Sequence, residues 1–292
     1  RYTDEISLPW LCSLRANCFN DDIAKRMHQA KLEMINYAIE SVDPHVQQHL
    51  LNRGNIRNSD VLRAINIFGK YGIRARMQNM IGLPLKNPLE DALNTLQFNM
   101  HHKVTDSWCS IFQPYPRTAL GQYCLEHGFV TQNVIEQCHE SFFDKSILDI
   151  DHKDEIYVVQ KLWYFMVEFS IPMDLVQILI RGKLSEELGE LIQELRYKYS
   201  REKLYNVKSD AVQNDNAKKD NAKKDSGEGQ LKVRFSREPK LHETAQRDIG
   251  HSLTKHREPI QLALNKVGLP EDFIALATKI EFADEQIEQF NM

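Results

Sequence analysis

The chain has 292 residues, a net charge of −4 and a hydrophobic fraction of 42%. This length buries a sizeable core in one or two domains, and the charge gives no global basic field that would attract nucleic acid. No apolar run is long enough to span a bilayer and no signal segment opens the chain, so we expect a cytoplasmic protein with no membrane span. The five cysteines are odd in number and widely spaced, which predicts reduced thiols and no metal site among them.

The first third of the chain begins with a strand inside residues 8–17, which has a polar end. Asn20 is suited to cap a helix that carries two acidic residues in its first turn. A second strand is expected from Met34 to Glu40. Pro44 then opens a polar helix, and a further helix has Asn58 or Ser59 as its cap and ends at Gly69 and Gly72.

The stretch from Ile73 to Leu120 organises the rest. It predicts a strand to Ile81, a Gly-Leu-Pro turn, a helix that starts at Asn87-Pro88, and a strand that ends in a Pro-Tyr-Pro turn. Strands that alternate with helices indicate an α/β fold with a parallel sheet, whose carboxyl ends gather the loops that carry chemistry. Four strands are too few for a closed barrel of about eight, so we expect an open or incomplete sheet.

The pattern becomes helical after the α/β part, which we assign to residues 1–130. We expect a helical extension over 131–205, a low-complexity linker over 206–230, and a small, mostly helical tail over 231–292 with one strand near its start. The linker contains the repeated pentapeptide NAKKD and almost no apolar residues. His251 and His256 are five positions apart, off the spacing that places two metal ligands on one helical face.

Four short motifs in the first 120 residues resemble those of a known family in order and spacing. They resemble strands three to six of the radical S-adenosylmethionine enzymes, with the closest likeness to the cobalamin-binding branch typified by the anaerobic magnesium-protoporphyrin IX monomethyl ester cyclase. The resemblance implies that residues 1–130 form part of a (β/α) barrel. The motifs are Cys12-Ser13-Leu14-Arg15-Ala16-Asn17, Tyr37-Ala38-Ile39-Glu40-Ser41, Asn79-Met80-Ile81-Gly82-Leu83-Pro84 and Phe112-Gln113-Pro114-Tyr115-Pro116-Arg117-Thr118.

The resemblance also implies cofactors. The family binds a 4Fe-4S cluster through a C-x3-C-x2-C loop, which is missing here, and the cluster cleaves S-adenosylmethionine to a radical that acts on a small organic substrate. Cobalamin and an electron donor such as flavodoxin or ferredoxin would be further partners. Because Arg1 is not a start residue and a strand follows at once, we expect the C-terminal portion of a longer oxidoreductase, cyclase or methyltransferase, inactive alone; the alternative is a degenerate member.

Five residues are carried over as cofactor-binding candidates, and no catalytic residue is assigned. Glu40 would accept hydrogen bonds from the ribose hydroxyls of S-adenosylmethionine, and Ser41 would add another. Arg15 would hold the methionine carboxylate or a substrate acid, and Asn79 the ribose or adenine. Four of these strand-end residues are expected to converge on one rim: Arg15, Glu40, Asn79 and Gln113. The competing interpretation is an ion pair between Arg15 and Glu40 with no ligand.

Two other functions stay open on the sequence. Ala38, Val42 and Arg117 are bulkier than the glycines of the family motifs, which favours a non-catalytic pseudoenzyme or binding scaffold. An ordinary phosphate-binding α/β barrel would require a glycine-rich loop that leads into a helix, and the sequence shows no such loop.

Overall fold

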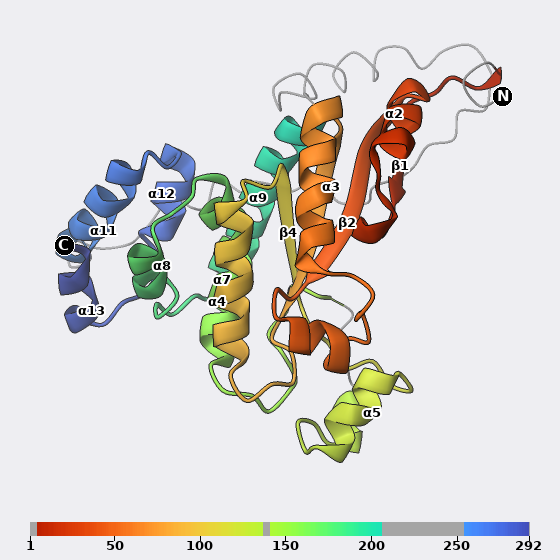
Figure 1. The fold of residues 1–292 in the computed structure, drawn as a ribbon. Helices are drawn as coiled ribbons and strands as arrows, with labels where there is room; N and C mark the ends of the chain where they lie inside the picture. The colour runs from red at the N-terminus through yellow and green to blue at the C-terminus, as the bar shows by residue number, and fades with distance from the viewer. Residues whose placement is uncertain (1–4, 137–140, 206–253, 292) are drawn as a thin grey trace, which may run out of the picture.

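The computed structural model describes residues 5–136, 141–205 and 254–291. Its centre is a sheet of four parallel strands in the order β1-β2-β3-β4 (Figure 1). The expected α/β class with a parallel sheet in chain order is therefore confirmed. The strands are β1 (Trp10–Ser13), β2 (Leu32–Glu40), β3 (Arg74–Ile81) and β4 (Asp106–Ile111).

The first strand is shorter than residues 8–17, because the chain leaves the sheet after Ser13 and forms a 3-10 turn, η1 (Ala16–Cys18). Among the described strands β1 pairs only with β2, so it forms an edge of the sheet. Two large apolar side chains near this edge, Leu8 and Leu11, are more than half exposed.

Helices α2 (Asp21–Gln29), α3 (Asn58–Tyr71) and α4 (Pro88–His101) connect the strands. The side chain of Asn20 accepts a hydrogen bond from the Ile23 amide (2.9 Å), as its capping role requires. Asn58 is the first residue of α3 and not its cap. The cap is Arg57, one position earlier, whose backbone amide donates a hydrogen bond to the Asp60 carboxylate (3.0 Å). The expected polar helix after Pro44 forms the π-helical turn η2 (Val46–Leu50).

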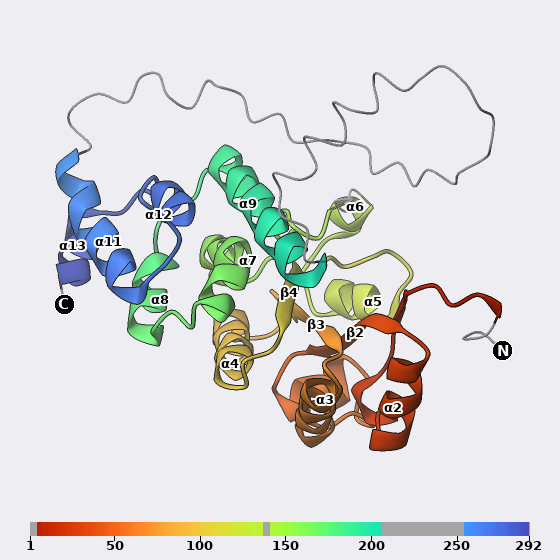
Figure 2. The same cartoon turned by 90° about the horizontal axis from the view of Figure 1, so that it is seen from above.

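Figure 2 shows α2, α3 and α4 along one face of the sheet and α5, α6 and α9 on its other side. The first face carries the apolar core: the rings of Tyr37 on β2 and Phe68 on α3 lie 5.2 Å apart, centroid to centroid. Helix α7 (Lys153–Glu168) packs against β4 and α4, and its Trp163 is 1% exposed. Helix α7, which belongs to the expected helical extension, thus forms part of this core.

The remaining helices are α5 (Ala119–Glu126), α6 (Gln132–Ile135), α8 (Met173–Leu179), α9 (Glu186–Tyr205), α11 (Thr254–Val267), α12 (Glu271–Ala277) and α13 (Asp284–Glu288), followed by the 3-10 turn η4 (Gln289–Asn291). The Gly268-Leu269-Pro270 break separates α11 from α12, and the described residues 254–291 of the tail contain three helices. The expected linker and the strand near residue 231 lie outside the described residues. No helix in the described ranges is long and apolar enough to cross a membrane.

Candidate functional site

One face of this parallel sheet is polar, which is unusual because such sheets are normally apolar on both faces. Buried and half-buried side chains alternate along β3, and the buried set faces α3 and α4. We call the opposite side the polar face; its side chains come from all four strands. The strand register places these polar side chains on it, together with some apolar ones: Ser13, Asn36, Arg74, Arg76, Gln78, Asp106, Trp108 and Ser110. Glu40 at the end of β2 lies beside them in the lining of a cavity.

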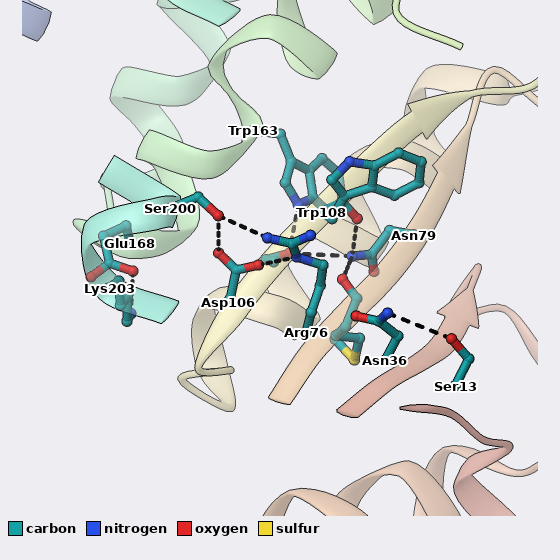
Figure 3. A network of polar contacts seen from close by, with 12 residues as sticks. Ser13, Asn36, Arg76, Asn79, Asp106, Trp108, Trp163, Glu168, Ser200 and Lys203 are labelled. Atoms are coloured by element: carbon teal, nitrogen blue, oxygen red, sulfur yellow. Dashed lines mark hydrogen bonds and ion pairs between the residues drawn. The ribbon is translucent and has the colours of Figure 1, made fainter. Parts of the chain in front are cut away.

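Helix α9 closes the polar face at the amino end of β4. Arg76 and Asp106 form an ion pair (Nε to Oδ2, 2.5 Å), and Ser200 of α9 donates a hydrogen bond to the second carboxylate oxygen (3.0 Å). Arg76 also donates to Ser200 Oγ (3.0 Å), which completes a three-residue link between sheet and helix (Figure 3). These polar groups satisfy one another, so they are poor candidates for ligand binding.

At the carboxyl end, the polar face opens into a cavity of about 310 Å³. In parallel α/β folds this end of the sheet is where ligands bind. The cavity is lined by Glu40, Gln78, Met80, Trp108, Ser110, Ile111, Phe112, Gln113, Tyr115 and Phe142. It therefore combines hydrogen-bonding groups from three strands with aromatic rings.

Glu40 borders the cavity because β2 is irregular at its end. The pairing of β2 with β3 shifts between Ala38 and Glu40, and Glu40 has a φ of 66°, a left-handed conformation that costs energy for a residue with a side chain. Such bulges re-aim side chains next to active sites.

The Glu40 carboxylate is paired on one side only. Arg53 donates from Nη1 to Oε1 (2.9 Å) and from Nη2 to the Ala38 carbonyl (3.2 Å). Burial raises the pKa of Glu40, and Arg53 opposes this shift by its charge and its hydrogen bond. The expected alternative, an ion pair with Arg15, is wrong: Arg15 is exposed and its side chain contacts Asn55.

Gln113 is the most unusual polar group of the cavity. It follows β4 and is 3% exposed, and neither its amide oxygen nor its amide nitrogen has a hydrogen-bond partner among the described residues. A buried amide without partners costs on the order of 1–3 kcal/mol, so such groups are rare unless a ligand or water completes them. Gln113 is therefore a hydrogen-bond donor and acceptor that a ligand of the cavity would satisfy.

Ser41 is turned away from this cavity toward α4. It is fully buried and donates from Oγ to Asp91 Oδ1 (2.5 Å), and it accepts a hydrogen bond from the Asp43 amide (3.1 Å). Burial raises the pKa of Asp91 to about 6; the Asp43 charge adds to this shift and the Ser41 hydrogen bond opposes it. The hydrogen bond from Ser41 to Asp91 thus attaches the chain segment next to Glu40 to helix α4.

Asn79 lies on the helical face of β3. Its amide nitrogen donates to Asn99 (3.2 Å) and Ser107 (3.2 Å), and Ser107 also accepts from Trp163 Nε1 (2.7 Å; Figure 3). All four residues are buried, so this network joins β3, β4, α4 and α7. The structure therefore brings Glu40 and Gln113 together at one cavity and places Arg15, Ser41 and Asn79 outside its lining.

Sequence reasoning missed Gln78, Trp108 and Ser110 of the cavity lining. The available signal was the run Arg74, Arg76, Gln78 in β3, since polar residues at every second position contradict the apolar pattern of a buried parallel strand. No group of three or more histidine, cysteine or acidic residues that could hold a metal ion occurs in the part of the chain that the structure describes. Cys138 lies outside those residues.

Comparisons with known proteins give partial matches. No family model matches the sequence. Over 125 residues the chain is 26% identical to an uncharacterized methyltransferase from Pyrococcus horikoshii, and the alignment covers 43% of this chain and 27% of that protein. The relative is named a methyltransferase, so the narrower resemblance to the cyclase gains no support.

Two solved structures of the radical S-adenosylmethionine methyltransferase TsrM from Kitasatospora setae are also similar, each at 16% identity. The structure with cobalamin and a 4Fe-4S cluster bound matches 40% of this chain and 22% of its own, with a TM-score of 0.36. The structure with tryptophan substrate and a S-adenosylmethionine analogue bound matches 41% and 23%, with a TM-score of 0.37. This chain thus spans about a quarter of the length of each protein it matches.

Proposed function

We propose that this chain supplies the S-adenosylmethionine-binding part of a methyltransferase of the radical S-adenosylmethionine type. The observation that carries the proposal is the cavity at the carboxyl end of the sheet, where a half-paired carboxylate and an unsatisfied buried amide meet. The four sequence motifs and the partial match to a methyltransferase support the choice of cofactor.

The two polar groups have complementary roles in this proposal. Glu40 would accept hydrogen bonds from the two ribose hydroxyls, because a carboxylate only accepts. Gln113 both donates and accepts, which suits the edge of an adenine ring, where an amino group lies beside a ring nitrogen. S-adenosylmethionine supplies an activated methyl group when it is bound, and the residues of this chain would hold and orient it.

The iron–sulfur cluster does not fit the described part of the chain, since no described group of residues could ligate it. We therefore assign no step of the reaction to these residues beyond cofactor binding. A small organic methyl acceptor, cobalamin and an electron donor belong to the proposal as partners of the whole protein.

Titration of the purified chain with S-adenosylmethionine in a calorimeter tests the proposal. Glu40→Gln keeps the size of the side chain but removes its charge and one acceptor, so affinity should fall roughly 10- to 100-fold. Glu187→Gln on exposed α9 is the matched control and should bind like the wild type. Absence of binding to the wild-type chain, or normal binding by a folded Glu40→Gln variant, would contradict the proposed site.

A further inference from the structure

Two stretches of the helical region have the same sequence of backbone elements. Residues 170–186 and 268–284 align without a gap, so that Pro172 matches Pro270 and Asp174 matches Asp272. Helices α8 and α12 each have seven residues, and each is followed by a turn, an isolated bridge and a new helix at corresponding positions. The structural match therefore extends over the whole helix–turn–helix unit, although Pro172/Pro270 and Asp174/Asp272 are the only identical pairs in the aligned stretch.

The backbone repeats in the same register. The residue two positions before each proline is left-handed, with a φ of 49° at Ser170 and 78° at Gly268. The prolines that precede the helices have nearly equal φ and ψ, −53° and 140° at Pro172 and −60° and 142° at Pro270. A left-handed residue followed by proline is a common way to end one helix before the next begins, so both connections use the same local geometry.

The two stretches bind each other through equivalent residues. Lys183 and its counterpart Glu281 form an antiparallel bridge, in which the Lys183 amide donates to the Glu281 carbonyl (2.8 Å) and the Glu281 amide donates back (3.1 Å). When equivalent residues exchange equivalent bonds, a local two-fold axis runs between them, as in an isologous dimer interface. Accordingly α12 contacts α9 while α8 contacts η4.

The contact is nevertheless built for unlike partners. Gly182 and Ile280 occupy equivalent positions, and a Cβ atom on Gly182 would lie 2.4 Å from Ile280 Cγ2 and 2.6 Å from a ring carbon of Phe282. Gly182 is not among the glycines with positive φ, so space and not backbone conformation requires it. If the first stretch paired with another first stretch, glycine would face glycine and leave a gap at this point. If the second stretch paired with another second stretch, two Ile280 side chains would compete for the same space.

We propose that the turn over residues 180–185 is a docking surface for a helix–turn–helix unit of its own kind, and that the matching unit in residues 254–291 is the partner it selects. Gly182 and Ile280 are the specificity-determining pair. The larger side chain of the second stretch fills the space that the glycine of the first stretch leaves, which excludes pairing of either stretch with itself. The proposal is independent of cofactor binding.

An exchange between the two stretches tests this inference in the full chain. Gly182→Ile and Ile280→Gly should each lower the unfolding temperature and speed amide exchange in α12 on the order of tenfold or more, through overlap and a cavity respectively. A Cβ at position 182 would meet both Ile280 and Phe282, so the exchange must also include Phe282 and its counterpart Leu184. The fourfold variant Gly182→Ile/Leu184→Phe/Ile280→Gly/Phe282→Leu has the wild-type composition and should recover most of the lost protection.

Gly69→Ala is the control, because no atom lies within 4 Å of a Cβ at Gly69. If Gly182→Ile does not fold, Gly182→Ala provides a milder overlap, and rescue by the exchange still decides the question. A fourfold variant as damaged as the two single variants combined would overturn the proposal, and so would single variants with wild-type protection in α12.

Discussion

Gln113→Met should stabilise the chain while it abolishes binding at the cavity. The amide of Gln113 is buried with both polar atoms unsatisfied, which costs about 1–3 kcal/mol relative to an apolar group of the same shape. Methionine has nearly the same length and no group that requires a partner. The free energy of unfolding should therefore rise by about 1–3 kcal/mol, or roughly 2–10 °C in the unfolding temperature of a chain of this size.

Thermal and urea unfolding of the two proteins measure this difference, and Gln97→Met on the exposed side of α4 is the matched control with no expected gain. S-adenosylmethionine should raise the unfolding temperature of the wild type and leave that of Gln113→Met unchanged. Loss of stability in Gln113→Met would refute the reasoning, because it would mean that the amide has a partner in the free protein.

Three further changes have defined outcomes. Asp91 has a pKa raised to about 6, so the folded state holds its proton more tightly than the unfolded state. The free energy of unfolding should therefore fall by up to about 3 kcal/mol as pH rises from about 4 to above 6. Asp91→Asn should remove this part of the pH dependence in urea unfolding, and an unchanged dependence would contradict the assignment. Trp163→Phe removes the donor that Ser107 accepts and should cost about 1–3 kcal/mol in the same assay, whereas a neutral effect would show that the bond contributes nothing. Gly121→Ala places a Cβ 2.2 Å from the Tyr115 carbonyl oxygen and should lower the unfolding temperature, while Gly69→Ala should leave it unchanged or raise it; equal effects would exclude this overlap.

The sheet could be predicted because its signals are local. The crossover helices show apolar faces, α2 begins after the cap Asn20 and α4 begins at Pro88, and strand order follows chain order in the sheet. Arg117, which stands where the family motif has glycine, adopts a φ of 64°, so the sequence also located a position that favours glycine. The length of β1 was misjudged because its last expected residues form a 3-10 turn, which has no strong sequence signal.

The site was harder to predict because side-chain direction in a strand depends on the position of a single residue. Gln78 lines the cavity and its neighbour Asn79 lies in the buried network on the opposite face. The bulge before Glu40 then resets this alternation at the end of β2, which the residue types alone do not show. Gln113 was selected from a motif, and its unsatisfied amide emerged only from three-dimensional packing.

The exposed edge at β1 has a consequence for handling the protein in solution. Its outer backbone groups pair with no other described strand, and Leu8 and Leu11 present apolar surface beside it. Exposed apolar side chains beside a sheet edge favour association between molecules, so aggregation should increase with protein concentration. Light scattering at increasing concentration would reveal this tendency, and a charged residue such as lysine in place of Leu11 should suppress it.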